Sequence, residues 1–194
     1  MIGELPKALE INGREYAIRS DFRDCLTILE AYQDGELSLE EKVYVAMDIL
    51  YVDFAGMPQD CYEEAYKKLL WFLNGGGIVS SDDKRERKRL MDWKQDAPLY
   101  FPAVNKTAGR EVRQSGYMHF WTFLGCYYEI GEGLFATVIS IRDKLAKGKK
   151  LEKYERDFYR DNKNLVDLKK PMSAEDKEWR AAVEALVNPG KGDI

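Results

Sequence analysis

Histidine is almost absent from this chain of 194 residues, which holds His119 and no other. Nucleophilic catalysis by a Ser-His-Asp or Cys-His arrangement needs a histidine beside the nucleophile. His119 stands among Met118, Phe120 and Trp121, and a single histidine in so apolar a segment is typical of a packed, hydrogen-bonded residue. Paired carboxylates are plentiful, but no spacing marks two of them as acid and base. We therefore expect no enzyme and no catalytic residue.

Cysteine is scarce too, with Cys25, Cys61 and Cys126 far apart in the sequence. The absence of a Cys-x-x-Cys pair argues against a zinc site. Asp92 and Asp96 lie four residues apart and could share a helix face, but a capping or solvated role is the stronger expectation. We predict no metal, and free thiols in a reducing cytosol.

Glycine-rich phosphate loops are missing as well. Gly75, Gly76 and Gly77 are not followed by a lysine and a hydroxyl residue at P-loop spacing, so we interpret them as the end of a helix. Gly131 and Gly133 form a break between two helical patterns. We expect no cofactor.

Long apolar runs and a strong net charge are also lacking. The sequence has no run of about 18 apolar residues, so no membrane helix is predicted. The N-terminus also lacks the apolar run of a signal peptide. With 33% charged residues and a net charge of −4, the chain has no global field to attract nucleic acid. We expect a soluble, cytoplasmic protein without membrane contact. One basic cluster could bind phosphates, although a solvated linker is the favoured interpretation: Lys84, Arg85, Arg87, Lys88 and Arg89.

What the sequence does have is one predicted hairpin, followed along the chain by segments with helical periodicity. Asn12-Gly13 between alternating apolar residues predicts a type I′ hairpin over residues 8–18. We expect it to dock on the helices or on another subunit, because a two-stranded ribbon is marginal alone. Ser20 is the expected N-cap of the first helix, a capping box at Ser38 and Glu41 starts the second, Asp60 starts the third, and Asp96 caps the fourth.

Aromatic residues gather in residues 117–128, where Tyr117, Phe120, Trp121, Leu124 and Tyr128 recur at helical spacing. Leu134, Val138, Ile141 and Leu145 repeat the pattern in the next helix. A charged segment follows from residue 149, and residues 173–186 predict a last helix.

The predicted fold is mainly α, a bundle of about six or seven helices with an N-terminal β-hairpin. We predict a hairpin-plus-helical core domain at 1–148 and a charged helical extension at 149–194. The expected core residues are Phe22, Leu26, Leu29, Val43, Met47, Leu69, Leu73, Phe120, Leu124, Val138 and Ile141.

Five short segments together resemble a known family. They are Asp-Phe-Arg at 21–23, Glu-Lys-Val at 41–43, Asp-Trp-Lys-Gln-Asp-Ala at 92–97, Met-His-Phe-Trp-Thr-Phe at 118–123 and Ile-Arg-Asp-Lys at 141–144. The order of these segments over residues 20–170 resembles that in the bacteriophage "gene product fifteen" family, which is found in phages and prophages of Gram-positive bacteria. That family often has two tryptophans after the histidine, whereas this chain has Phe120 first.

The resemblance implies a role in siphophage tail assembly in the cytoplasm of the bacterial host. Such genes usually lie between those of the major tail protein and the tape-measure protein, and a protein in that position is expected to be a tail assembly chaperone. The expected partners are the tape-measure protein, the major tail protein and further copies of this chain as a homo-oligomer. The residues assigned to protein binding are Tyr117, His119, Phe120, Trp121, Arg142, Trp93 and Asp96.

Three alternatives stay open at this point. The chain could be a structural tail or head-completion component that remains in the mature virion. It could be a small nucleic-acid-associated protein that acts through the basic cluster. The aromatic residues could be internal core rather than an interface, which is the favoured interpretation for Trp121, and the hairpin could pack on its own subunit.

Overall fold

The structure, a computed structural model, describes residues 3–77 and 88–169. The predicted mainly α fold with one N-terminal β-hairpin is confirmed. Eight α-helices lie in the described residues, beside two short 3-10 turns, η1 (Gln59–Cys61) and η2 (Val112–Gln114). The helices are α1 (Phe22–Gln33), α2 (Leu39–Leu50), α3 (Tyr62–Leu73), α4 (Ala97–Ala108), α5 (Phe120–Tyr128), α6 (Leu134–Ala146), α7 (Lys153–Asp161) and α8 (Lys163–Val166).

The hairpin pairs β1 (Ala8–Ile11) with β2 (Arg14–Ala17) in antiparallel register. Asn12 and Gly13 have φ of 49° and 76°, as the two central residues of a type I′ turn require. Leu9 and Ile11 are buried, β1 packs on α3, and the Asn12 amide donates to Glu64 at 2.9 Å. The hairpin therefore docks on the helices of its own subunit.

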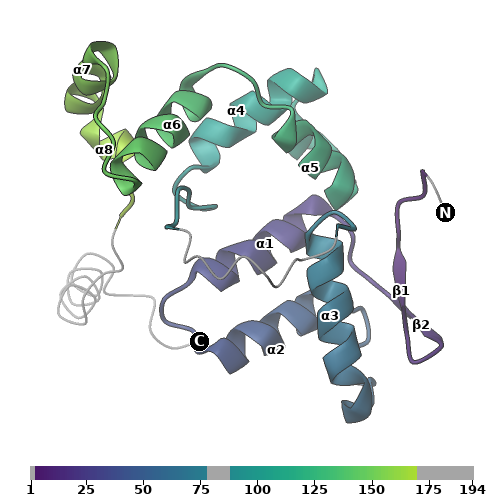
Figure 1. Cartoon of the computed structure of the whole chain (residues 1–194). Helices are drawn as coiled ribbons and strands as arrows, with labels where there is room; N and C mark the ends of the chain where they lie inside the picture. Colours follow the sequence, from purple (N-terminus) through teal and green to yellow (C-terminus); the bar gives the residue numbers. More distant parts are fainter. Residues whose placement is uncertain (1–2, 78–87, 170–194) are drawn as a thin grey trace, which may run out of the picture.

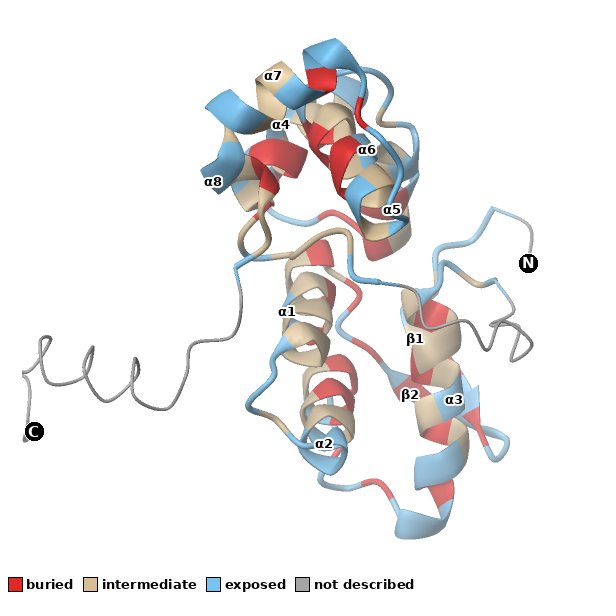
Figure 2. Ribbon diagram, turned by 60° about the vertical axis from the view of Figure 1, so that its left-hand side comes forward, coloured by how far each residue is buried: buried red, intermediate tan, exposed pale blue. Residues whose placement is uncertain are grey.

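The helices form two groups (Figure 1). The hairpin, α1, α2 and α3 make one group, and α4 to α8 make the other. The two groups meet where α1 packs on α5. There the ring of Phe22 stacks on that of Phe123, with centroids 4.9 Å apart. Buried positions lie within each group as well as near this contact (Figure 2), and one hydrophobic cluster includes residues of both groups.

Of the four expected helix caps, one is confirmed and two are corrected, while Asp96 stands at the expected N-cap position of α4 without a side-chain capping hydrogen bond. The capping box of Ser38 and Glu41 is present in α2. The first helix is capped by Asp21 instead of Ser20, because the Asp21 carboxylate accepts from the Arg23 amide. The third helix does not begin with a capping residue at Asp60, since η1 fills that position and Cys61 precedes α3 without a side-chain cap.

The aromatic segment also departs from the expected helix. α5 begins at Phe120, because the His119 side chain caps it, so Tyr117 lies before the helix. Tyr128 is the last residue of α5 and is 68% exposed. Leu134 and Leu145, expected on the core face of α6, are 50% and 41% exposed. Val138 and Ile141 of the expected stripe are buried, and the inward face of α6 also includes Phe135 and Arg142.

Most of the expected core is buried. Leu26, Leu29, Val43 and Leu73 are half-buried and pack against its edge, while the other expected members are fully inside: Phe22, Met47, Leu69, Phe120, Leu124, Val138 and Ile141.

The segment after residue 148 folds back on α6. Leu151 and Val166 are buried, α8 packs on α6, and Lys144 on α6 pairs with Glu155 on α7 at 2.6 Å. The division into a 1–148 domain and a 149–194 extension stays a prediction. The expected last helix at 173–186 and the basic residues Lys84, Arg85 and Arg87 lie outside the described residues.

Candidate protein-binding surface

His119 ties the start of α5 to the N-terminal segment. Its Nδ1 accepts from the Trp121 amide at 3.0 Å, and its Nε2 donates to the Pro6 carbonyl at 2.9 Å. The ring is 3% exposed. Burial lowers the pKa of His119, and nearby Lys7 acts in the same direction, while the bond to Pro6 opposes it. His119 is therefore a neutral structural residue at neutral pH.

Trp121 and Phe120 pack against the end of α3. Phe120 is fully buried, and the Trp121 indole donates from Nε1 to the Phe72 carbonyl at 2.8 Å. The Trp121 ring also meets Trp71 edge to face at 5.3 Å between centroids. Gly76, with φ of 82°, lets the chain pass under this ring, since a Cβ there would lie 2.9 Å from Trp121 Cη2.

Asp96 and Arg142 form a buried ion pair, with side chains 1% and 5% exposed and a shortest N–O distance of 2.6 Å. All five N–H groups of the guanidinium are used. Besides the two bonds to the Asp96 carboxylate, Arg142 donates to the carbonyls of Leu90, Leu165 and Val166. The pair thus fastens α4, α6, α8 and the segment before α4 to one another.

Trp93 and Tyr117 complete the set expected to bind protein. Trp93 is half-buried and packs edge to face on Tyr100 at 5.6 Å. Tyr117 is 48% exposed, with its hydroxyl 2.8 Å from Ser20 Oγ and the Lys7 ammonium over its ring. Of the seven expected residues, only Tyr117 is exposed. The others lie in two internal clusters, so their role in binding a partner stays a prediction.

Two of the five basic residues in the cluster of positive charge are described, and both bind within the chain. Lys88 donates to the Ala146 carbonyl at 2.9 Å. Arg89 pairs with Asp92 and also donates to the Gln33 carbonyl. These two cations therefore hold the segment before α4 in place.

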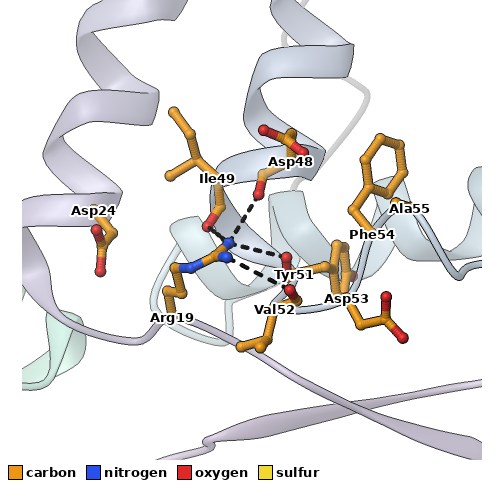
Figure 3. Close-up of a pocket in the computed structure, with 9 residues that line it drawn as sticks. All are labelled: Arg19, Asp24, Asp48, Ile49, Tyr51, Val52, Asp53, Phe54 and Ala55. Carbon is orange, nitrogen blue, oxygen red and sulfur yellow. Dashed lines mark hydrogen bonds between the residues drawn. The ribbon is translucent and has the colours of Figure 1, made fainter.

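A polar pocket of about 340 Å³ lies beside the end of α2. Arg19 lines this pocket and donates to the carbonyls of Asp48, Ile49 and Tyr51 at 2.9–3.0 Å (Figure 3). The last carbonyls of a helix need such partners. Partial burial raises the pKa of Asp24 at the pocket rim, and the nearby Asp21 carboxylate adds to the shift. The arrangement caps a helix and offers no reacting pair.

An open apolar groove of about 500 Å³ lies at the turn between α5 and α6. Met91 forms part of one wall and accepts a hydrogen bond on Sδ from the Tyr127 hydroxyl at 2.9 Å. Exposed Tyr128 stands at the rim. The groove is lined by Leu90, Met91, Tyr127, Tyr128, Ile130, Phe135, Ala136, Ile139 and Ser140.

The sequence interpretation missed this groove. Tyr127 lies in the last turn of α5 and Ile130 follows that helix, while Phe135 and Ile139 lie one position away from the stripe that was expected to face inward. Periodicity within each helix cannot show that the two helices and the segment at 90–91 leave a gap between them. The one available signal was the pair Tyr127-Tyr128 at a helix end, because two adjacent residues cannot both face the core.

Other kinds of site have little support in the part of the chain that is described. Among residues 3–77 and 88–169, no group of three His, Cys, Asp or Glu side chains is placed to hold a metal ion. No helix within the same ranges has the length and apolar character to cross a membrane.

Fold and surface together define a mainly helical protein with a hairpin docked on its own bundle and an open apolar groove. The sequence matches the model of the family described as Bacteriophage Gp15 protein over residues 1–168, and the chain belongs to that family. The match includes the hairpin as well as the helices. No curated protein and no solved structure shows a match. The chain is therefore a phage-associated structural or assembly protein.

Proposed function

We propose that this chain is a non-enzymatic tail assembly chaperone that binds the tape-measure protein and keeps it soluble until the tail tube forms. The observation that carries the proposal is the apolar groove between α5 and α6 in a phage structural or assembly protein. An amphipathic helix binds by placing its apolar face in such a groove. A tape-measure protein rich in long helices would present such faces repeatedly.

The composition of the groove suits a contact that forms and releases. Its rim carries Tyr128, and its floor carries Phe135 and Ile139, so aromatic and branched side chains would cover the client helix. Aromatic anchors supply much of the binding energy at protein interfaces. A single groove of this size covers a short stretch of helix, and many copies along one client would supply the total strength. Contacts between copies and with the major tail protein belong to the same proposal.

Co-expression with the tape-measure protein of the same phage or prophage tests this function. The expected result is a soluble tape measure that is recovered by affinity pull-down and carries many copies of this chain, as counted from the mass of the complex. An insoluble tape measure, with this chain eluting alone, would contradict the proposal. Recovery of the chain from purified virions would instead favour a structural component of the tail or head.

A further inference from the structure

The charges of this molecule are separated between its two helical groups. Residues 24–66, which include most of α1, all of α2 and the start of α3, hold eleven acidic residues and one basic residue, Lys42. Residues 144–153, which we call the lysine turn, span the end of α6 and the start of α7 and hold five lysines and one acidic residue, Glu152. This distribution can attract a second copy, although the net charge is only −4.

Three side chains of the lysine turn present an unpaired charge. Lys149, Lys150 and Lys153 are exposed and form no ion pair with any residue in 3–77 or 88–169. The other two lysines of the turn are paired with carboxylates of α6 and α7. Leu145 and Tyr154 lie at the two ends of the turn and are 41% and 67% exposed, so the turn also offers apolar surface.

The polar pocket beside the end of α2 offers the opposite charge. Three carboxylates line this pocket of about 340 Å³, those of Asp24, Asp48 and Asp53, and Figure 3 shows them around Arg19. Arg19 donates to the backbone carbonyls at the end of α2 and pairs with none of these carboxylates. Val52, another residue of the lining, is 53% exposed. We call this site the acidic pocket.

Asp24 shows the excess of negative charge in the acidic pocket. Burial raises the pKa of Asp24, and the carboxylate of Asp21 adds to the shift, while Arg19 and Arg23 oppose it only in part. A nearby cation stabilises the charged form of a carboxyl group. The pocket therefore favours an ammonium group that enters from outside.

We propose that copies of this chain associate head to tail, with the lysine turn of one copy in the acidic pocket of the next. Figure 1 shows the end of α2 on one side of the molecule and the α6–α7 turn on the other. Each bound copy therefore still presents a turn or a pocket to a further copy, and such a contact builds an open row or a ring.

Charge complementarity selects a second copy as the partner. A nucleic acid would satisfy the lysine turn alone, and a basic peptide would satisfy the acidic pocket alone, whereas a second copy satisfies both. Exposed ion pairs are individually weak, so the association should be reversible. A row of copies suits an extended client such as a tape-measure protein. That use rests on the proposed function, but the association itself does not, because it needs only this chain.

Sedimentation of the full chain without a client measures the association. At about 0.1 M salt, where charges act over ~10 Å, the mean mass should rise with protein concentration beyond that of a dimer. At about 1 M salt this range falls to ~3 Å, and the chain should sediment as a monomer. A monomer under both conditions, or an association that the higher salt leaves unchanged, would overturn the proposal.

Charge reversal identifies the two surfaces. The turn variant carries Lys149→Glu with Lys150→Glu, and the pocket variant carries Asp48→Lys with Asp53→Lys. Each variant alone should need at least about tenfold more protein than the wild type to associate, because like charges then face one another. An equal mixture of the two should associate again, since the intact pocket of the first meets the intact turn of the second.

Lys106→Glu with Arg110→Glu is the matched control for the turn variant, because both residues are exposed and the net charge changes equally. This control should associate as the wild type does, and an equal loss in it would contradict a specific role of the turn. Renewed association in the mixture also shows that both variants fold. A mixture that stays monomeric would overturn the head-to-tail contact.

A different partner would give a different result in the same experiments. Binding of DNA by the wild type without self-association, lost in the turn variant, would assign the lysine turn to nucleic acid and overturn the proposal. No client is present in these measurements, so they separate this inference from the proposed function. Failure of the association would leave binding of the tape measure to the α5–α6 groove untouched, and failure of the co-expression test would leave the association in place.

Discussion

At the scale of single residues, buried polar side chains fix this fold. Arg142 donates to five acceptors in three parts of the chain, and His119 accepts from the Trp121 amide and donates to the Pro6 carbonyl. Both residues carry the family resemblance and were expected at an interface. Their positions show that a short sequence signature can mark internal hydrogen bonding as readily as a contact with a partner.

Removing the Arg142 guanidinium should be among the most damaging single changes. Arg142→Met leaves the Asp96 carboxylate buried without its cation, and breaking a buried pair from one side costs about 3–5 kcal/mol. Arg142→Lys should also destabilise strongly, because one ammonium cannot reach five acceptors held in a fork. Urea denaturation would measure both variants. Arg160→Ala, at an exposed ion pair, should leave the midpoint unchanged, and an equal loss there would contradict this account.

His119 should make stability fall as the pH drops. Burial lowers its pKa in the folded state, whereas the unfolded side chain titrates near 6.5. Below about pH 6.5 the unfolded state therefore binds more protons, and the folded state loses stability until the pH reaches the folded pKa. A protonated ring also has no acceptor for the Trp121 amide.

His119→Asn isolates this effect, because asparagine keeps an N-cap acceptor and does not titrate. Denaturation at pH 7.5 and pH 5.5 should show a smaller loss of stability in the variant than in the wild type. An identical pH dependence in the two proteins would mean that His119 does not supply it.

At the scale of elements, the fit between the end of α3 and the start of α5 depends on a glycine. Gly76 and Gly109 both have positive φ, but only Gly76 lies against a side chain. Gly109→Ala should cost roughly 1–2 kcal/mol for the left-handed backbone. Gly76→Ala should cost more, since its Cβ would press on the Trp121 ring, which is held by the Phe72 carbonyl. Thermal unfolding would compare them, and equal losses would show that the Trp121 contact is unimportant.

Local signals predicted the elements well, and long-range contacts decided their details. The Asn12-Gly13 turn and the capping box at Ser38 need only neighbouring residues, so the sequence was sufficient to place both. The start of α5 depends on His119, whose ring is fixed by Pro6 more than a hundred residues away. The Asp96–Arg142 pair depends on contacts among α4, α6, α8 and Leu90, and the groove lies between α5, α6 and residues 90–91, which no periodicity within one helix reveals.

At the scale of the whole molecule, two helical groups share one core and leave the groove on the outside of the second group. The proposed binding of the tape measure should then depend on the groove rim and not on exposed aromatic residues elsewhere. Tyr128→Glu should reduce recovery of the client by about tenfold or more, as for an aromatic residue that anchors an interface. Tyr44→Glu on α2 is the matched control, because Tyr44 is similarly exposed, 62% against 68%.

The most direct measurement is photo-cross-linking in cells that make this chain and its tape-measure protein. A photoreactive phenylalanine analogue would replace Tyr128 at the groove rim in one protein and Tyr44 on α2 in the other. The account predicts a cross-link from position 128 to the tape measure and a much weaker one from position 44. Equal cross-linking from both positions, or none from position 128, would contradict the groove as the client site.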